Sequence, residues 1–279
     1  MILVADSGST KTEWCLAENG KRVKTILTKG INPVFENEEA ISQELKVGLM
    51  PELKGFTIDE VHFFGAGCAY ESVNKIVENA VSSLLDVPVE VQSDLLCAAR
   101  ALFGKGKGIA CIMGTGSNSC YYNGMRIVRN VSPLGFILGD EGSGAVLGKL
   151  LVGACLKNQL GAGMEKKFLE RFHLTRPEII DRVYRKPFPN RFLAGLSIFL
   201  HENIELPEVR SLVREAFDSF FLRNVMQYPD YHMLKVSFTG SIAYYYQDIL
   251  KEVAAGRGLH VGTIVKAPME GLLAYYAGL

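Results

Sequence analysis

The amino-acid sequence predicts an α/β protein made of two related halves. Residues 2–27 have the pattern of an apolar strand, a small polar turn, a second strand, Asn19-Gly20 and a third strand. Residues 108–131 repeat this order, with Asn123-Gly124 at the corresponding turn. Asn-Gly between alternating strands is a strong hairpin signal, because both central residues take positive φ. Each half is therefore expected to begin with a three-stranded β-meander, and the repeat indicates a duplicated fold.

The rest of the first half alternates helices with strands. Gly30-Ile31-Asn32-Pro33 forms a polar break, after which apolar residues recur at helical or strand spacing. The expected elements are a helix over 41–49, a strand over 60–64 that ends at Gly65-Ala66-Gly67, a helix over 73–85, a strand over 89–92 and a helix over 95–102. A meander followed by this alternation is typical of an α/β layer structure.

The second half follows the glycine-rich stretch 104–108, which has the composition of a hinge and lacks the spacing of a Walker phosphate loop. Beyond the second meander, helices are expected over 142–160, 164–172, 177–184, 191–203 and 207–228, then a strand over 235–238, a helix, a strand over 261–265 and a short terminal helix. The predicted domains are an N-terminal lobe, 1–104, and a C-terminal lobe, 105–279, with inserted helices at about 150–230.

Composition excludes several classes of protein. The 279 residues suffice for two domains, and 48% hydrophobic with 22% charged residues is typical of a globular protein. Basic and acidic residues number 30 each and the basic ones are scattered, which predicts no nucleic-acid partner. We expect no membrane segment and no secretory signal, and hence a cytoplasmic protein. The six cysteines form no close pair, so buried free thiols are expected rather than disulfides or metal ligands.

The tight first turn of each meander is rich in Gly, Ser and Thr. These turns are Gly8-Ser9-Thr10-Lys11-Thr12 and Gly114-Thr115-Gly116-Ser117-Asn118. Backbone N–H groups and hydroxyls in such turns can converge on an anion, usually phosphate. Two such loops predict a nucleotide held in a cleft between the halves. Asp6, just before the first loop, could hold a hydrated Mg²⁺, or could be a turn-forming aspartate that bonds its own backbone.

Two further carboxylates stand next to predicted helices. Asp94 follows a strand, where α/β folds place ligands, and could accept a proton from an attacking alcohol. The pattern alone favours a helix cap by Ser93 or Asp94. Asp140 lies within Gly139-Asp140-Glu141-Gly142 and could bind a hydroxyl or a metal, or could only favour the helix dipole.

A third glycine turn lies between a strand and a helix near the C-terminus. Gly240, Ser241, Ile242 and Ala243 could present backbone to a flat ligand such as an adenine–ribose unit. Such turns are common, so this signal is weak by itself.

In combination and in this order, these motifs resemble the N-acetylglucosamine kinase family. The specific part is Gly114-Thr-Gly-Ser-Asn118 followed by Gly139-Asp-Glu-Gly-Ser143, and Tyr184-Arg185 and Arg191-Phe192 continue the similarity. This family belongs to the sugar kinase, Hsp70 and actin superfamily and to the BadF/BadG/BcrA/BcrD-type ATPase group. The resemblance implies duplicated ribonuclease H-like (actin-like ATPase) domains with a central cleft.

The resemblance also implies roles for particular residues. Asp94 would be the catalytic base, Asp6 would bind Mg²⁺ through water, and ATP and an amino sugar would be the substrates. The ATP phosphates would be bound by Gly8, Ser9, Thr10, Lys11, Thr12, Gly114, Thr115 and Gly116, the adenosine by Gly240, Ser241, Ile242 and Ala243, and the sugar by Asn32, Thr115, Asn118 and Asp140. The expected reaction is phosphorylation of N-acetylglucosamine on its 6-hydroxyl. A homodimer is compatible with the resemblance.

One position departs from the family pattern, and two other functions remain open. Leu134 stands where the family has a tryptophan that frames the sugar, so the preferred sugar stays open. The first alternative is a related ATPase that activates a partner enzyme and carries an iron–sulfur cluster. Its cysteine pattern is approached but not matched by Cys111-Ile-Met-Gly-Thr-Gly. The second is a nucleotide- or sugar-binding sensor without turnover, which the retention of Asp94 and Asp140 disfavours.

Overall fold

The computed structural model describes residues 1–8 and 10–278, so Ser9 and Leu279 lie outside the described residues. The chain divides into two compact units. Unit 1 comprises Met1–Gly106, Gly124–Arg126 and Pro268–Leu279, and unit 2 comprises Lys107–Asn123 and Ile127–Ala267. The division near residue 105 lies at the glycine-rich stretch. The C-terminal helix, which the sequence assigned to the second lobe, belongs with unit 1 because it packs on the helix that begins at Asp94.

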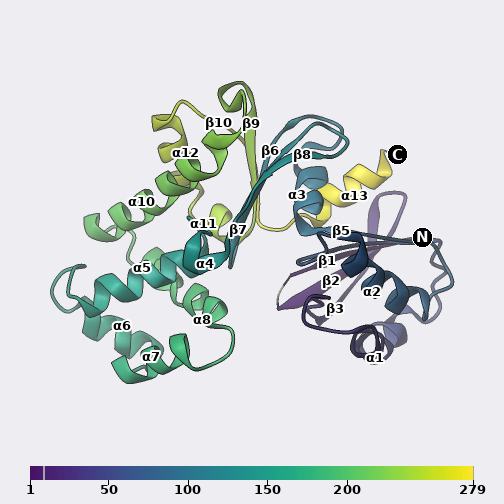
Figure 1. Cartoon of the computed structure of the whole chain (residues 1–279), viewed down its shortest axis with the longest axis horizontal. Helices are drawn as coiled ribbons and strands as arrows, with labels where there is room; N and C mark the ends of the chain where they lie inside the picture. The colour runs from purple at the N-terminus through teal and green to yellow at the C-terminus, as the bar shows by residue number, and fades with distance from the viewer. Residues whose placement is uncertain (9, 279) are drawn as a thin grey trace. The chain divides into compact units, whose positions relative to one another are not determined.

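Unit 1 contains a five-stranded sheet in the order β3-β2-β1-β4-β5 (Figure 1). Its strands are β1 (Ile2–Ser7), β2 (Lys11–Glu18), β3 (Lys21–Lys29), β4 (Glu60–Gly65) and β5 (Val89–Ser93). The first three form the expected antiparallel meander, and β4 and β5 run parallel to β1. Asn19 and Gly20 have φ values of 50° and 72°, which confirms the predicted hairpin turn.

Helices cover both faces of this sheet. They are α1 (Glu38–Gly48), the 3-10 helix η1 (Met50–Leu53), α2 (Glu71–Ser82), α3 (Asp94–Phe103) and α13 (Met269–Ala277). Trp14 and Phe63 are fully buried on the face that α1 and α2 cover. Val4 and Phe64 are buried on the other face, against α3 and α13. The C-terminal helix therefore completes the second core of unit 1.

Unit 2 repeats the same sheet topology. Its order is β8-β7-β6-β9-β10, built from β6 (Gly108–Met113), β7 (Ser117–Tyr122), β8 (Ile127–Val131), β9 (Lys235–Thr239) and β10 (His260–Val265). The turn after β7 differs from the prediction, because Gly124 has a positive φ of 97° whereas Asn123 does not. The connection spans residues 123–126, and a Cβ at Gly124 would lie 2.4 Å from the Lys105 carbonyl oxygen. Glycine is thus needed here for a close backbone approach as well as for its φ.

Most helices of unit 2 lie between β8 and β9. They are α4 (Gly135–Leu138), α5 (Gly144–Leu156), α6 (Met164–Phe172), α7 (Arg176–Tyr184), α8 (Pro189–Leu196), α9 (Ile198–Glu202) and α10 (Pro207–Arg223), with 3-10 turns η2 (Val225–Gln227) and η3 (Tyr231–Met233). The helices α11 (Ser241–Tyr245) and α12 (Gln247–Gly256) separate β9 from β10. The single helix expected over 191–203 is broken at Ser197 into α8 and α9. One continuous apolar core, which includes Phe199, Phe217 and Phe238, joins these helices to the sheet.

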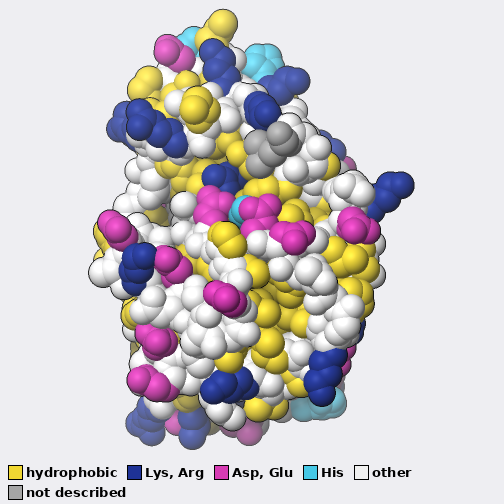
Figure 2. Space-filling model, turned by 90° about the vertical axis from the view of Figure 1, so that its right-hand side faces the viewer, with side chains coloured by type: hydrophobic (Ala, Val, Ile, Leu, Met, Phe, Trp, Pro, Cys, Tyr) yellow, Lys and Arg dark blue, Asp and Glu magenta, His cyan; other side chains and the backbone are white. Residues whose placement is uncertain are grey.

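Several expectations about side chains can be compared with the structure. All six cysteines are free and buried, as expected from their apolar surroundings. Among the described residues, no helix is long and apolar enough to cross a membrane. Figure 2 shows one face of the molecule, on which basic side chains are interspersed with acidic and apolar ones.

Candidate functional site

In unit 1, the predicted site residues gather where the parallel strands end. Ser7 on β1 is in register with Gly65 on β4, and Gly65 is in register with Ser93 on β5. The Ala66 N–H donates to the Ser7 carbonyl oxygen at 3.1 Å. The carboxyl ends of β1, β4 and β5 therefore form one edge, where α/β sheets bind ligands. Asp94 is the first residue beyond this edge on the β5 side.

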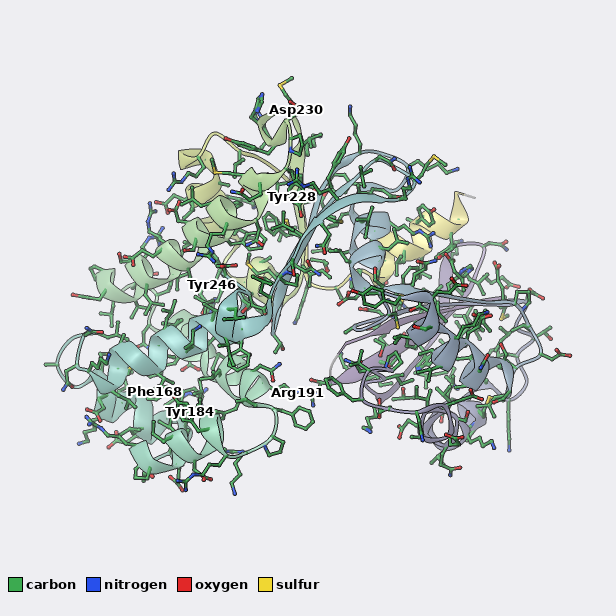
Figure 3. All side chains as sticks on the ribbon, in the orientation of Figure 1. Phe168, Tyr184, Arg191, Tyr228, Asp230 and Tyr246 are labelled. Carbon is green, nitrogen blue, oxygen red and sulfur yellow. The ribbon has the colours of Figure 1, made fainter. Side chains whose placement is uncertain are left out.

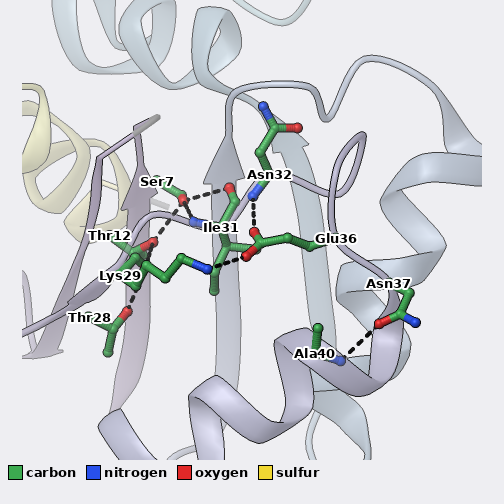
Figure 4. A network of polar contacts seen from close by, with 9 residues as sticks. All are labelled: Ser7, Thr12, Thr28, Lys29, Ile31, Asn32, Glu36, Asn37 and Ala40. Carbon is green, nitrogen blue, oxygen red and sulfur yellow. Dashed lines mark hydrogen bonds and ion pairs between the residues drawn. The ribbon is translucent and has the colours of Figure 1, made fainter. Parts of the chain in front are cut away.

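The first glycine loop is braced by hydroxyl groups beneath it (Figure 4). The buried Ser7 Oγ lies 2.7 Å from Thr12 Oγ1, donates to the Ile31 carbonyl at 2.9 Å and accepts from the Ile31 N–H at 3.0 Å. Thr12 Oγ1 also donates to the Lys29 carbonyl oxygen at 3.1 Å. A Cβ at Gly30 would lie 2.4 Å from the Gly8 carbonyl oxygen, so the loop is closely packed against residues 30 and 31.

The predicted phosphate-binding residues of this loop differ in accessibility. Gly8, Thr10 and Lys11 are exposed to solvent. Thr12 is fully buried and its hydroxyl is bonded within the unit, so this side chain braces the loop. Ser9, also predicted to bind phosphate, lies outside the described residues.

Asn32 lies in the next loop, beside the same strand edge. Its Oδ1 accepts from the Val34 N–H at 3.0 Å, and its own N–H donates to Glu36 Oε2 at 3.0 Å. A Cβ at Gly67 would lie 2.5 Å from Asn32 Oδ1, and Gly67 has a φ of 86°. Among the described residues, no partner contacts the Asn32 side-chain N–H₂ group, which Figure 4 shows directed away from the polar network. This group is available to donate to a ligand.

The structure shows which of the two residues, Ser93 or Asp94, caps helix α3. Ser93 is the N-cap of α3, since its Oγ accepts from the Leu96 N–H at 3.2 Å. Asp94 is the first residue of the helix, and its carboxyl is not needed as the cap. Burial raises the pKa of Asp94, and a hydrogen bond from the Leu95 backbone partly opposes this. A carboxylate with a raised pKa at a strand edge has the properties of a general base.

At the same edge, the pKa of Asp6 is raised to about 7. Burial is the main cause, the negative charges of Asp94 and Glu13 add to it, and Lys11 opposes it. Ionisation of Asp6 near neutral pH therefore has a cost that a cation would relieve. Among the described residues, no group of three or more acidic, histidine or cysteine ligands forms a metal cage. A site with Asp6 as its carboxylate fits Mg²⁺, which is often held by one or two carboxylates, phosphate oxygens and water.

In unit 2, three of the predicted motifs lie side by side. The N–H groups of Gly144 and Ala145, at the start of α5, donate to the carbonyl oxygens of Gly114 and Thr115 at 2.8 and 3.0 Å. Gly114 N–H in turn donates to Gly116 at 2.9 Å. The second glycine loop is thus fixed to the N-terminus of α5. The space beside Gly114 is open, because a Cβ at this residue would meet no atom within 4 Å.

The glycine turn predicted to bind adenosine packs against the same loop. Gly240 has a φ of 122°, and a Cβ there would lie 2.3 Å from the Met113 carbonyl oxygen. A Cβ at Gly144 would lie 3.4 Å from Ile242 Cδ1. Ser241 is exposed, whereas Ile242 and Ala243 are buried. The backbone of Gly240 and Ser241 is therefore the accessible part of this motif.

Asp140 faces the second glycine loop. Its φ is 50°, and its Oδ2 would lie 3.1 Å from a Cβ at Gly116. Burial raises the pKa of Asp140, which the backbone of Ser117 and the charge of Lys149 partly oppose and the charge of Glu141 reinforces. Asn118, also predicted to bind sugar, accepts on Oδ1 from Asn130 Nδ2 at 2.9 Å.

Comparison with solved structures identifies the family. A candidate N-acetylglucosamine kinase from Porphyromonas gingivalis is 47% identical to this chain, over 100% of this chain and 99% of that protein, with a TM-score of 0.97. The chain belongs to the N-acetylglucosamine kinase family. It is a carbohydrate kinase with duplicated actin-like ATPase domains.

More distant structures share the kinase fold. A candidate N-acetylglucosamine kinase from Chromobacterium violaceum is 17% identical over 98% of both chains, with a TM-score of 0.74. A ROK family glucokinase from Streptomyces griseus, in complex with glucose and AMPPNP, is 14% identical over 98% of this chain and 97% of that one, with a TM-score of 0.58. No protein-family model and no curated protein matches the chain.

The structure adds one residue of this kinase that the sequence pattern did not single out for a role. Glu141 Oε1 is 2.5 Å from Arg223 Nε, and Glu141 Oε2 accepts from Asn224 Nδ2 at 3.1 Å. The Glu141 carbonyl oxygen also accepts from Ser117 Oγ at 2.9 Å. Glu141 therefore joins the loop of Asp140 to the second glycine loop and to the end of α10. Its partners on α10 are over 80 positions away, so no local motif could reveal them.

The position of the missing family tryptophan is also defined. Leu134 has a left-handed backbone, with a φ of 60°, and its side chain is 59% exposed. The Asp140 N–H donates to the Pro133 carbonyl oxygen at 2.9 Å, so Leu134 lies close to Asp140. A leucine at this accessible position offers a smaller apolar surface than an indole ring would.

Proposed function

We propose that this kinase transfers the γ-phosphate of ATP to the 6-hydroxyl of an amino sugar, with N-acetylglucosamine as the preferred substrate. The observation that carries the proposal is the position of Asp94 at the strand edge of unit 1, with the capping role taken by Ser93. A carboxylate at this edge can accept the hydroxyl proton as the oxygen attacks phosphorus. The 47% identity to a candidate N-acetylglucosamine kinase supports the choice of sugar.

The two glycine loops are proposed to bind the phosphates. In unit 1, exposed Gly8, Thr10 and Lys11 would contact them above the buried Ser7 and Thr12 hydroxyls. In unit 2, the loop of Gly114 and Gly116 is held by α5 and keeps its backbone accessible. Phosphoryl transfer depends mainly on positioning and charge neutralisation, which rigid loops provide.

Mg²⁺, when bound near Asp6, would neutralise phosphate charge. The Asp6 carboxylate would hold it through water, and Glu13 and Asp94 add to the negative potential there. Lys11, whose positive charge opposes theirs at Asp6, is exposed at the same loop and would orient a phosphate oxygen.

Polar side chains are proposed to recognise the sugar. Asn32 offers its side-chain N–H₂ group as a donor, while Asp140 offers acceptor oxygens next to Gly116. Asn118 and Thr115 belong to the loop that faces Asp140. Leu134 is an exposed apolar residue of the segment that precedes Asp140 and would contact an acyl substituent on the sugar.

Replacement of Asp94 by asparagine tests the catalytic assignment. We expect Asp94→Asn to lower kcat by a factor of about 10² to 10⁴, the usual contribution of a general base, while nucleotide binding is retained. Asp86→Asn, which changes an exposed aspartate of the same unit, is the matched control and should keep full activity. A variant of Asp94 that retains more than about a tenth of the activity would refute the role of base.

The sugar is tested separately with a panel assayed for ADP release in the presence of MgATP. N-acetylglucosamine, glucosamine, N-acetylmannosamine, N-acetylmuramic acid and glucose would be compared by kcat/KM. The proposal predicts the highest value for N-acetylglucosamine. A higher value for a sugar without the acetamido group would show that this enzyme is a carbohydrate kinase of different specificity.

A further inference from the structure

A cavity opens among the inserted helices of unit 2, where α6 ends and α7 is joined to α8. Its volume is about 510 Å³, within the range of sites that hold small molecules. The wall combines apolar side chains, among them Phe172 and Leu174, with the guanidinium groups of Arg182 and Arg191. Among the described residues that line it, none is acidic. The cavity is therefore both apolar and positively charged.

Both guanidinium groups stack on aromatic rings that line the same cavity. Arg182 Cζ lies 5.1 Å from the centroid of the Phe192 ring, and Arg191 Cζ lies 4.2 Å from that of Phe188. Figure 3 labels Arg191 on α8. Stacking engages the flat face of a guanidinium, so the N–H groups at its edge remain directed in the plane, where they can donate to an anion. The rings thus restrict the orientation of these donors.

Six other arginines of unit 2 are neutralised by carboxylates. Ion pairs with Glu or Asp are formed by Arg171, Arg176, Arg210, Arg214, Arg223 and Arg257. Among the described residues, Arg182 forms no such pair. The charge of Arg182 contributes to lowering the pKa of Glu178. The Glu178 carboxylate, however, accepts hydrogen bonds from the Thr175 N–H and hydroxyl at 2.8 and 2.7 Å. The charge of Arg182 is therefore only partly compensated within the protein.

The backbone at Phe188 is strained in a way that serves the cavity. Phe188 has a φ of 58° and a ψ of 49°, and its side chain is 57% exposed. A left-handed backbone is unfavourable for a bulky residue and persists where the surroundings require it, often at ligand sites. This conformation places the ring against Arg191 at the N-terminus of α8. Burial of the ring cannot explain the strain, because most of the ring is in solvent.

We propose that this cavity binds a phosphate monoester of the size of a phosphorylated sugar. Two guanidinium edges suit the three terminal oxygens of such a group, because arginine forms bidentate hydrogen bonds to phosphate. The apolar wall of Phe172, Leu174 and Phe192 suits the C–H faces of a sugar ring. A neutral sugar would leave the charge of Arg182 only partly compensated, and a bare phosphate ion would leave the apolar wall in contact with water.

The site has a consequence that rests on the proposed function. If this kinase produces a sugar 6-phosphate, its product belongs to the class of ligand that the cavity fits. The cavity would then sense the product at a distance in sequence from Asp94, Asp6 and the glycine loops. Binding itself does not depend on that function, so the two proposals can fail separately.

Binding is tested by titrating the full chain with glucose 6-phosphate, inorganic phosphate and glucose, by calorimetry in the presence of saturating AMPPNP. AMPPNP occupies the proposed phosphate loops, so the heat then reports other sites. We expect glucose 6-phosphate to bind more tightly than inorganic phosphate, and any heat from glucose to be the same in the wild type and in Arg182→Gln. Arg182→Gln should weaken binding at least about tenfold, the loss expected for a charge-assisted hydrogen bond. Lys157→Gln, which removes an exposed positive charge elsewhere in unit 2, should leave the affinity unchanged.

Phe188→Gly provides a second variant that is expected to fold, because glycine adopts this φ freely. It should weaken binding without lowering the unfolding temperature, and basal kinase activity should stay unchanged in both variants. Affinity for glucose 6-phosphate should also increase as the pH rises through about 6, where a phosphate monoester takes its second charge. Binding that AMPPNP abolishes, or that Arg182→Gln and Phe188→Gly leave unaltered, would overturn the proposed site. Loss of sugar phosphorylation with retained binding would refute only the proposed function.

Discussion

Replacement of Asp6 by asparagine is predicted to stabilise the folded protein at high pH. Burial, with the charges of Asp94 and Glu13, raises the Asp6 pKa from 3.8 to about 7. A carboxyl whose pKa is raised in the folded state costs stability once it ionises. The cost is absent below the unfolded-state pKa of about 4 and reaches its full value above about pH 7. The rise corresponds to about 4 kcal/mol, and the partial exposure of Asp6 makes this an upper value.

The assay is urea unfolding followed by the fluorescence of Trp14. Trp14 is the only tryptophan, and it is fully buried in a core of unit 1. Asp6 belongs to the same unit. We expect Asp6→Asn to exceed the wild type in free energy of unfolding at about pH 8, and the difference to vanish near pH 4. Asp86→Asn is the control for the loss of one exposed carboxyl in the same unit.

The same measurement with Mg²⁺ examines the proposed metal ligand. Binding to the folded state raises the free energy of unfolding, so millimolar Mg²⁺ should stabilise the wild type and not Asp6→Asn. Equal stabilisation of both proteins would show that Asp6 does not hold the ion. If Asp6→Asn were no more stable than the wild type at pH 8, or equally more stable at pH 4 and pH 8, the raised pKa would be refuted.

Three shorter predictions concern other parts of the structure. Ser93→Ala should cost about 1 kcal/mol of stability and lower kcat by displacing the carboxyl of Asp94, the proposed base. Thr175→Ala, which removes the cap of α7, should cost a similar amount with kcat unchanged. Glu141→Ala leaves the buried Asn224 amide without its acceptor and should lower the free energy of unfolding, followed by circular dichroism, by about 1–3 kcal/mol. It should also raise the KM for sugar, whereas Glu141→Gln should keep the wild-type stability and KM. His62 and Arg100 lower the pKa of Glu90 to about 2. Up to about 3 kcal/mol of stability should therefore be lost as the pH falls from about 4.5 to 2. A Glu90→Gln variant that lost the same amount over that range would contradict this prediction.

The sequence could predict the fold because the hydrophobic pattern is local and is repeated. The two meanders, the alternation that follows the first and most of the inserted helices agree with the structure. The register of β1, β4 and β5 then brings Ser7, Gly65 and Ser93 to one edge, as expected for parallel strands. The prediction for the turn at Asn123 was wrong, because the close approach of Gly124 to Lys105 depends on a segment outside the hairpin.

Other features depend on contacts that no local pattern encodes. The C-terminal helix belongs to unit 1 because Leu272 and Leu273 are buried with Val4 and Phe64, at the opposite end of the chain. The same helix contributes Tyr276, whose ring stacks on His62 with 4.0 Å between the centroids. The sequence could not show whether Ser93 or Asp94 caps α3, since both residue types are good caps.

The duplication places equivalent loops in both units, but the loops are braced by different groups. In unit 1, side-chain hydroxyls of Ser7 and Thr12 support the loop, and acidic side chains surround it. In unit 2, the carbonyl oxygens of Gly114 and Thr115 accept from the first turn of α5, and Ser117 Oγ donates to the Glu141 carbonyl oxygen. The carboxylate of Asp6, whose pKa is raised to about 7, would need a cation beside it when phosphate approaches. The metal requirement of the reaction should therefore originate in unit 1, and substitutions that alter it should map to Asp6 and its neighbours rather than to the second loop.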